Sequence, residues 1–487
     1  MADVARQGGE REHSLRSGAL GLFDSAVMGV AGSAPAYSIA ATTTALFGAV
    51  LYGGAAALLY CGIFMFGIVF AFNYLNKTDQ HAGAAYSWVR RALHPILGYL
   101  SGWALVVSAL IFMVIATFPA GSSVISLFST RLASNTTLVT IFGAVFFLLM
   151  IGAVAAGVTV TVKVQIIMSS IEVTLLLLFA LLAIFHAHHA VHFSWHWFAP
   201  SIFNAKGSSG FVAGALLAAF YYWGWDVTAN LSEETKESHK TSGAGGLIGA
   251  FVVFCLYEVF TIASATVLTP AQLNNPNNAA DILQVLGQSV WRGTGGKLIV
   301  VAVLLSTVAT LETTIIQVTR TLYTMGRDRT LPASLGRTHA TRQTPVVATV
   351  AVAAISLLLF VASQYIGSVS SILTDGYNAI GLQIAIYYSL AGFSVVILYR
   401  RQIFRSAKNF VFMGLWPLAG AIFMAWIFTK VIPGLNGTTL VVGLGAMAIG
   451  LLPMVWYWVK GAPYFKMPAP GDRHAADLEV AEFEQNL

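Results

Sequence analysis

An organic anion could bind where the first long hydrophobic segment of the chain is interrupted. This segment contains the run Ala31-Gly32-Ser33-Ala34-Pro35. Glycine and proline weaken a helix, and a half-helix beginning near Pro35 would direct its first backbone N–H groups towards the preceding residues. These donors and the helix dipole favour a carboxylate. The residues at this interruption are Ala31, Gly32, Ser33 and Ala34; an ordinary kinked helix is the alternative.

A second interruption carries groups that suit a cation. It reads Tyr221-Tyr222-Trp223-Gly224-Trp225-Asp226. A helix broken here would free the carbonyl groups of Tyr221, Tyr222 and Trp223 to accept hydrogen bonds from an ammonium group. The three rings could also cover that group by cation–π contact. Packing of the rings against lipid or neighbouring helices is the alternative.

Glu172 is the most isolated acidic residue of the chain, because residues 164–185 contain no other charged side chain. An ionisable group near the middle of a bilayer is costly and is a functional hypothesis by default. Its carboxyl group could carry a proton or ligate a cation. A purely structural hydrogen-bonding role remains open.

Three further acids lie in hydrophobic segments and are secondary candidates: Glu258, Glu312 and Asp375. Glu312 is separated by about 135° from a polar stripe on its predicted helix, so it should face a different neighbour. That stripe consists of Ser306, Thr310, Thr313, Gln317, Arg320 and Thr324. Asp375 is close enough to the outer surface to act as an external gate. Structural pairing is as good an interpretation of Glu258 and Glu312 as function.

The composition predicts an all-α polytopic membrane protein. Of the 487 residues 57% are hydrophobic and 9% are charged, whereas soluble domains carry about 25% charged residues. The long stretches with few charges divide into twelve predicted transmembrane helices. Their approximate bounds are 22–48, 51–75, 96–127, 137–157, 164–186, 210–232, 243–268, 297–323, 345–364, 370–398, 409–431 and 438–459.

The two interrupted segments are the first and sixth of these helices, which suggests a repeat of five helices plus five. An odd number of helices in each half inverts the second half in the membrane, and such inverted repeats hold their substrate near the midplane. We therefore divide the chain into an N-terminal tail (1–20), a ten-helix transport core (21–400), two accessory helices (401–460) and a C-terminal tail (461–487).

The basic residues predict the orientation. If both termini are cytoplasmic, 21 of the 26 lysines and arginines lie on the inside and 5 on the outside, as the positive-inside rule requires. The expected location is the plasma (inner) membrane. The net charge of +6 then needs no nucleic acid to explain it.

Nothing in the sequence favours an enzyme, a cofactor or a resident metal. The two cysteines, Cys61 and Cys255, lie in predicted spans, which disfavours a disulfide or zinc site. No glycine-rich phosphate loop or nucleophile elbow is present. The predicted external loop holds five histidines, for which a solvated surface or adventitious metal affinity is the better interpretation. They are His186, His188, His189, His192 and His196.

Three connecting motifs resemble those of amino acid–polyamine–organocation permeases. They are His81-Ala82-Gly83-Ala84-Ala85-Tyr86-Ser87-Trp88 with Gly98-Tyr99-Leu100-Ser101-Gly102-Trp103, then Glu233-Glu234-Thr235-Lys236, and then Arg320-Thr321-Leu322-Tyr323-Thr324-Met325-Gly326-Arg327. Their order and spacing cover residues 20–400. The resemblance implies the leucine-transporter fold, a substrate carboxylate at residues 31–34, and secondary transport of amino acids or amines.

The resemblance also bears on single residues. Asp226 matches an acid common in the family, so within the substrate site it should support a gate or a helix end. Many proton-coupled relatives carry a lysine at about the helical position of Glu172, in place of a sodium ion. Glu172 departs from that pattern.

The leading interpretation is a proton-coupled permease that imports an amino acid or organic amine by alternating access. Its partners would be that small molecule, the proton or a sodium ion, and the lipid bilayer. An exchanger and a polyamine permease are alternatives of the same class. A non-transporting substrate sensor is the alternative from another class, and a membrane enzyme is the weakest because no catalytic constellation is present.

Overall fold

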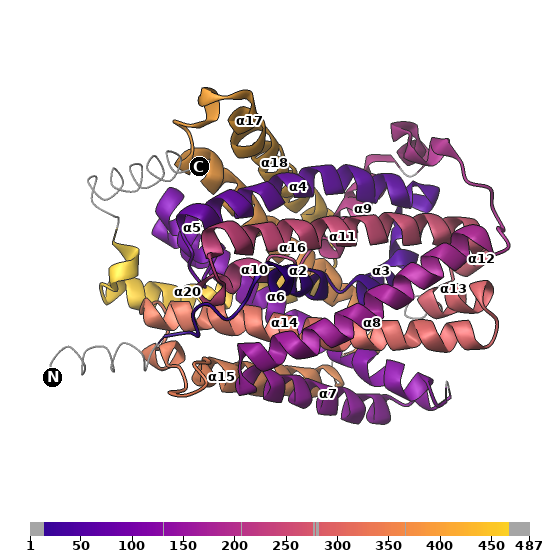
Figure 1. The fold of residues 1–487 in the computed structure, drawn as a ribbon, viewed down its shortest axis with the longest axis horizontal. Coiled ribbons are helices and arrows are strands. Elements are labelled where there is room, and N and C mark those ends of the chain that lie inside the picture. Colours follow the sequence, from indigo (N-terminus) through magenta and orange to yellow (C-terminus); the bar gives the residue numbers. More distant parts are fainter. Residues whose placement is uncertain are drawn as a thin grey trace.

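The computed structural model describes residues 14–129, 131–205, 207–275, 278, 282–365 and 367–466, and this part of the chain is almost entirely helical. Most of the predicted tail segments 1–20 and 461–487 lies outside the described residues. The longer helices (Figure 1) are α2 (Leu22–Ser33), α3 (Pro35–Val50), α4 (Gly54–Thr78), α6 (Pro95–Ser126), α7 (Thr136–Ala156), α8 (Val158–Phe185), α9 (Gly207–Tyr221), α11 (Ser238–Val267), α14 (Thr294–Arg327), α15 (Val346–Ser363), α16 (Val369–Leu398), α18 (Trp416–Val431) and α20 (Ala446–Val459). The shorter ones are α5 (Ala85–Ala92), α10 (Val227–Asn230), α12 (Pro270–Leu273), α13 (Ile282–Val290), α17 (Ala407–Asn409) and α19 (Gly437–Leu440).

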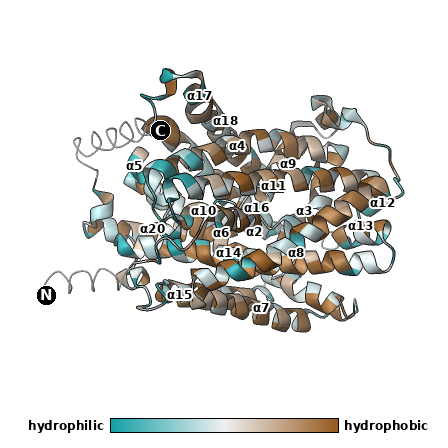
Figure 2. Ribbon diagram, in the orientation of Figure 1, coloured by the Kyte–Doolittle hydropathy of each residue, from teal (hydrophilic) through white to brown (hydrophobic). Residues whose placement is uncertain are grey.

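Ten helical stretches in the described residues are long and apolar enough to cross a bilayer. The outer helices α7, α15 and α20 expose large apolar side chains, such as Leu149 (56% exposed), Leu358 (70%) and Leu452 (72%). Figure 2 shows hydrophobic residues along the helices of the bundle, with hydrophilic residues concentrated towards its ends. A surface of this kind is suited to contact with lipid.

The first helix is interrupted where the sequence predicts. Helix α2 ends at Ser33 and α3 begins at Pro35, and Ala34 between them has a left-handed backbone with φ of 49°. Pro35 occupies the first position of α3, where a missing N–H is tolerated. The chain therefore changes direction at this point without losing a helical hydrogen bond of α3.

The second predicted interruption is also observed. Helix α9 ends at Tyr221, and helical structure resumes only at Val227 in α10. Gly224, between them, has a φ of 103°. L-amino acids that have a side chain rarely adopt this backbone angle.

The two interruptions contact each other inside the bundle. A Cβ atom added to Gly32 would lie 2.2 Å from the carbonyl oxygen of Gly224, and one added to Gly224 would lie 2.1 Å from the carbonyl oxygen of Gly32. Any side chain at either position would overlap the opposite backbone. Helices α2 and α10 accordingly overlap near the middle of the bundle in Figure 1.

The first and last described segments lie at one end of the bundle, which we call the α5 end. Leu15 packs there with Ala82 and Tyr323, and the Tyr464 hydroxyl donates to the Tyr86 carbonyl over 3.0 Å. The opposite end, which we call the α13 end, carries α12 and α13 (Figure 1). The two ends give a frame for placing the site.

Candidate functional site

Glu172 binds the N-terminus of the half-helix α3. The backbone N–H of Ala36 donates to Glu172 Oε1 over 3.0 Å, and the next N–H, of Tyr37, donates to Ser306 Oγ over 3.1 Å. Glu172 and Ser306 are fully buried. The sequence predicts an anion at this helix end and, separately, a role for Glu172 in binding a proton or a cation. In the structure the carboxyl group of Glu172 lies at this helix end.

The backbone at residues 31–34 is bound by side chains of other helices. The Gly32 carbonyl accepts from Thr310 Oγ1 over 3.1 Å, and the Ser33 carbonyl accepts from the Tyr257 hydroxyl over 2.7 Å. The Ala34 N–H bonds back to carbonyls of α2. In this conformation an incoming carboxylate would therefore have to displace Glu172 or Ser306 to reach the donors of α3.

The carbonyl groups of the second interruption have free acceptor capacity. Among the described residues, no hydrogen bond ends on the carbonyl oxygens of Tyr221, Tyr222 or Trp223. Their side chains are held by the protein. The hydroxyl of Tyr221 bonds to Thr43 over 2.8 Å, that of Tyr222 donates to the Leu58 carbonyl over 3.1 Å, and Trp223 Nε1 donates to the Tyr387 hydroxyl over 2.6 Å. The rings are thus packed, while the carbonyls could still accept from an ammonium group.

Asp226 joins the second interruption to two long helices. Its carboxylate accepts from Gln317 of α14 over 2.9 Å and from Tyr387 and Tyr388 of α16 over 2.9 and 3.1 Å. The side chain is fully buried. Three donors to one carboxylate favour the role of helix-end support for this residue.

Three residues of the polar stripe of α14 contact the interruptions. Ser306 and Thr310 bond to the first interruption, and Gln317 bonds to Asp226 in the second. Glu312, off the stripe, faces α8 instead, where its Oε2 accepts from Gln165 over 2.6 Å. Glu258 of α11 has no hydrogen-bond partner on either carboxyl oxygen within the described residues.

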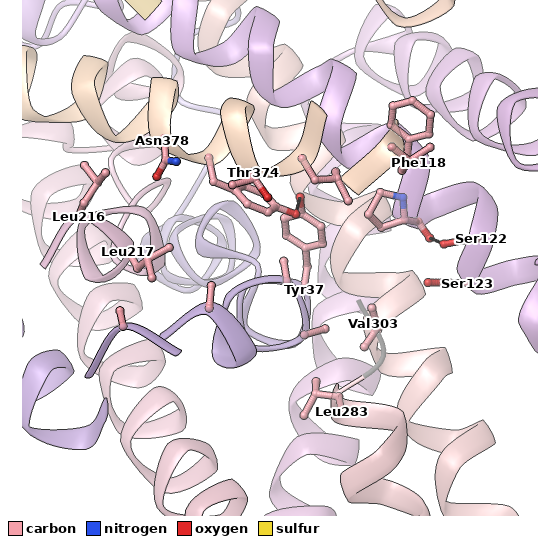
Figure 3. Close-up of a pocket in the computed structure, with 18 of the residues that line it drawn as sticks. Tyr37, Phe118, Ser122, Ser123, Leu216, Leu217, Leu283, Val303, Thr374 and Asn378 are labelled. Carbon is pink, nitrogen blue, oxygen red and sulfur yellow. Dashed lines mark hydrogen bonds between the residues drawn. The ribbon is translucent and has the colours of Figure 1, made fainter. Parts of the chain in front are cut away.

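A cavity of about 1200 Å³ occupies the α13 end, between α3, α6, α9, α16 and α18 (Figure 3). None of the predicted site residues lines it. Tyr37 and Tyr377 lie where the cavity approaches the interruptions, with their hydroxyl groups 3.3 Å apart. The ring of Phe112 packs against Tyr37 and that of Phe220 against Tyr377. This aromatic partition was missed from the sequence, although Tyr37 follows the first interruption by only three residues.

Among the described residues, no carboxylate lines the cavity. These lining side chains are apolar or neutral and polar, apart from Lys430 of α18. Asp375 follows the lining residue Thr374, but its Oδ1 accepts from Asn436 over 2.8 Å and from Thr439 over 2.9 Å. This placement favours a structural role for Asp375, in which it holds α19 in place, rather than the role of an external gate.

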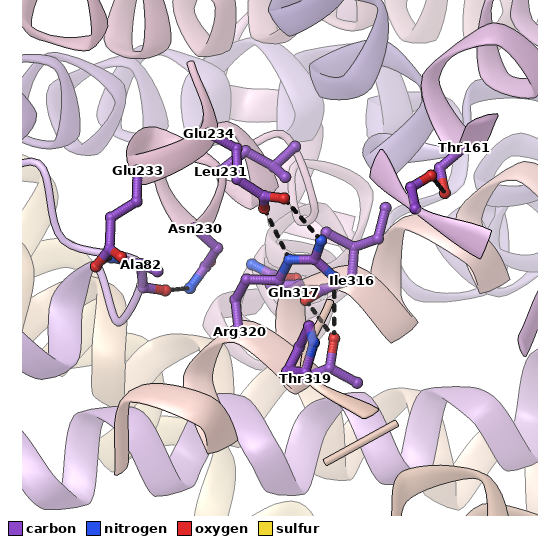
Figure 4. A network of polar contacts seen from close by, with 12 residues as sticks. Ala82, Thr161, Asn230, Leu231, Glu233, Glu234, Ile316, Gln317, Thr319 and Arg320 are labelled. Atoms are coloured by element: carbon purple, nitrogen blue, oxygen red, sulfur yellow. Dashed lines mark hydrogen bonds and ion pairs between the residues drawn. The ribbon is translucent and has the colours of Figure 1, made fainter. Parts of the chain in front are cut away.

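Ion pairs and hydrogen bonds connect the elements at the α5 end, and Figure 4 shows those of Arg320 and Asn230. Arg320 donates to both carboxyl oxygens of Glu234 over 2.9 and 3.1 Å, and both side chains are fully buried. Nearby, Arg327 binds Glu233, and Asn230 donates to the Ala82 carbonyl over 2.8 Å. These contacts join α14, the loop before α5 and the chain after the second interruption.

The buried pair Arg320–Glu234 and the partly exposed pair Arg327–Glu233 should differ in their effect on stability. Glu234→Gln leaves the charge of Arg320 buried without its partner, and we expect a loss of about 3–5 kcal/mol. Glu233→Gln, in a pair whose members are 21% and 35% exposed, should cost about 0–1 kcal/mol at pH 7. Thermal unfolding of the detergent-solubilised variants measures both. Equal losses would contradict this assignment of the buried pair.

The Glu233 pair should also weaken in acid. Burial alone would raise the pKa of Glu233, but the hydrogen bonds and charge of Arg327 outweigh it and hold the pKa below its usual value. The pair therefore stabilises the folded state above the unfolded pKa of about 4.3 and loses this contribution as the pH falls through the folded pKa. The stability difference between wild type and Glu233→Gln should shrink on acidification to about pH 4.

A family described as amino acid permease matches residues 20–459. The chain belongs to this family. The resemblance to the amino acid–polyamine–organocation superfamily is thereby confirmed, and with its apolar helices this permease is a multi-pass membrane protein and not an enzyme.

Relatives of this permease differ in what their names say they carry. It is 23% identical to a methylthioribose transporter of Bacillus subtilis (57% of this chain, 60% of the relative). It is 27% identical to a branched-chain amino acid permease of the same organism (40% and 39%) and 27% identical to its serine/threonine exchanger (53% and 58%). The matched part thus spans between 39 and 60% of the length of these relatives.

Proposed function

We propose that this permease is a secondary transporter that imports a neutral amino acid together with a proton, by alternating access across the plasma (inner) membrane. The observation that carries the proposal is the hydrogen bond from the Ala36 N–H to Glu172, at a helix interruption that touches a second one. A buried, ionisable carboxyl group thus holds the donors best suited to a substrate carboxylate.

The fold behind this proposal is the leucine-transporter arrangement of twelve spans with a five-plus-five inverted repeat. Two spans supplement the ten long apolar stretches. The stretch Leu22–Thr78 contains a 3₁₀ turn at Leu51–Gly53 that separates α3 from α4, and the shorter apolar helix Gly210–Tyr221 supplies the other. The interruptions then fall in the first and sixth spans, as expected for equivalent helices of two repeats.

Proton coupling follows from competition for one helix end. A substrate carboxylate that reaches the N–H of Ala36 displaces the carboxylate of Glu172. Displaced into a buried site without that donor, Glu172 is more stable with a proton than with a charge. Substrate and proton therefore bind together, and they leave together when Glu172 returns to the helix end.

The cavity favours a neutral amino acid over a diamine. A dication would need acidic partners. Among the described residues that line the cavity there is no carboxylate, and Lys430 is the one charged residue. The unoccupied carbonyls of Tyr221, Tyr222 and Trp223 provide acceptors for a single ammonium group. The branched-chain amino acid permease among the relatives supports the same substrate class.

The end at which the cavity lies supports import. The cavity lies at the α13 end, while ion pairs close the α5 end. If both termini are cytoplasmic, as the basic residues favour, the cavity faces the outside. This conformation suits capture of an external substrate. The serine/threonine exchanger among the relatives supports exchange as the second candidate.

Uptake by proteoliposomes of the purified permease tests the proposal. We expect saturable uptake of neutral amino acids, stimulated by an acidic exterior, from a panel that also contains diamines. Methyl esters of the transported amino acids should bind at least tenfold more weakly, because the α3 donors lose their anion. Preference for diamines would instead support a polyamine permease. Uptake that needs internal substrate and ignores pH would support an exchanger.

A further inference from the structure

We propose that Glu312 is a second proton-binding carboxyl group, which receives the proton from Glu172 on its way to the α5 end. The inference rests on the proposed proton coupling and extends it to a route. The route would pass Ser169 and Gln165, between the two acids. We call these four residues, Glu172, Ser169, Gln165 and Glu312, the polar row.

One face of α8 carries three members of the row. Gln165, Ser169 and Glu172 are spaced by four and three residues, which places them on the same side of a helix. Gln165 and Glu172 are fully buried, and Ser169 is 4% exposed. At 1.5 Å per residue the row extends about 10 Å along α8.

The side of α14 that faces α8 has residues level with both ends of the polar row. Ser306 lies level with Glu172, since both bind consecutive N–H groups of α3. Two turns further on, Gln165 donates to the Ala309 carbonyl over 2.8 Å and to Glu312 over 2.6 Å. Helix α14 continues to Arg327, which binds Glu233 at the α5 end. Glu312 is therefore nearer that end than Glu172.

Each member of the row has a buried oxygen without a hydrogen-bond partner in the described part of the chain. These atoms are Glu172 Oε2, Ser169 Oγ, Gln165 Oε1 and Glu312 Oε1. A buried polar atom left unpaired costs about 1–3 kcal/mol. Two of them, on Ser169 and Gln165, belong to side chains between the two acids, and the other two belong to the acids. Together they indicate a path for a proton rather than a packing feature.

The transfer conserves charge. Glu172 gives up its proton and becomes a carboxylate bound by the Ala36 N–H, while the carboxylate of Glu312 takes up a proton on Oε1. The Ser169 hydroxyl can accept and donate a proton, and water entering the row would carry it over the remaining steps. Gln165 holds Oε2 of Glu312 and so leaves Oε1 to be protonated.

Few other titratable groups face the row. From α11, Tyr257 approaches Glu172 and donates to the Ser33 carbonyl. Lys163 of α8 is exposed.

On α14 the next ionisable group after Glu312 is Arg320, which is paired with Glu234. Asp226 is bound by Gln317. Of the other packed helices, α7 and α13 have no charged residue and α2 has only Asp24, in its first turn. Glu312 is thus the proton acceptor that the row offers.

The experiment compares Glu312→Gln with wild type in proteoliposomes, with a transported amino acid and an inward pH gradient of about one unit. Such a gradient supports about tenfold accumulation for one proton. We expect Glu312→Gln to accumulate less than twofold, whereas counterflow exchange, which needs no net proton movement, stays within threefold of wild type. Glu312→Asp should restore at least half of the accumulation. Glu258→Gln, which changes an acid outside the row whose two carboxyl oxygens are buried, is the matched control.

The outcomes separate this inference from the coupling that it assumes. If Glu172→Gln loses accumulation and Glu312→Gln keeps it, the second site is wrong and the proposed function stands. If wild type shows no accumulation driven by pH, the coupling itself fails. Accumulation by wild type that follows sodium would overturn both. If Glu312→Gln does not fold, Ser169→Ala serves instead, with an expected loss of at least threefold in the initial rate of pH-driven uptake, and an unchanged rate contradicts the route.

Discussion

Glu172→Gln is expected to abolish accumulation driven by a pH gradient, reducing an about tenfold accumulation ratio per pH unit to about one. The amide keeps the size of the side chain and can still accept from the Ala36 N–H, so we expect the variant to fold and to bind substrate. It cannot titrate, so the coupling of substrate binding to proton binding is lost. Flux measurements with and without a pH gradient, and with sodium in place of the gradient, test the residue.

Binding measurements sharpen the same test. In wild type a lower pH favours the protonated form of Glu172, which releases the Ala36 N–H for the substrate. The apparent substrate Kd should therefore tighten by up to about tenfold per pH unit as the pH falls. The Kd of Glu172→Gln should not change with pH over the same range. A variant that accumulates substrate as wild type does at every pH would make Glu172 structural, and a dependence on sodium alone would make it a cation ligand.

A large loss of folded protein is expected from Gly224→Ala. The new methyl group would lie 2.1 Å from the Gly32 carbonyl oxygen, and the φ of 103° is unfavourable for alanine. Forced overlap in a packed core costs about 1–3 kcal/mol or more, with a further 1–2 kcal/mol from the backbone. We expect at least a tenfold loss of transport per cell together with a lower Tm of the purified protein. The reciprocal variant Gly32→Ala should behave in the same way.

Two matched glycines provide the control. Gly48 in α3 and Gly152 in α7 have no atom within 4 Å of an added Cβ. Alanine favours a helix over glycine by about 1 kcal/mol, so Gly48→Ala and Gly152→Ala should be neutral or stabilising. Normal transport by Gly224→Ala would show that the two interruptions do not need to touch.

The sequence predicts local features of this fold well, because helix breaks and apolar length are local properties. The ends of α2 and α9 follow from glycine and proline in runs of hydrophobic residues. The predicted span starts at residue 164, directly after the charged Lys163, which is later than the start of α8. The helix begins at Val158, and Lys163 remains exposed within it. A long basic side chain can extend from a helix towards water, so its charge does not mark the helix end.

The partners of the site residues could not be predicted, because they depend on how distant helices pack. Glu172 and Ala36 are 136 residues apart, and Arg320 and Glu234 are 86 apart. The polar stripe of α14 is an intermediate case: its periodicity shows that Glu312 must face elsewhere, but only the packed structure identifies Gln165 of α8 as the neighbour.

The cavity also has a consequence for inhibition. Its volume of about 1200 Å³ exceeds that of most sites for drug-sized molecules, which occupy about 300–1000 Å³. The Tyr37 and Tyr377 hydroxyls, 3.3 Å apart, lie between this space and the interruptions. A rigid compound that filled it without disturbing that pair would occupy the path of the external substrate to the interruptions and would prevent the α13 end from closing. Such a compound would block uptake in competition with external substrate, so excess substrate should relieve the block.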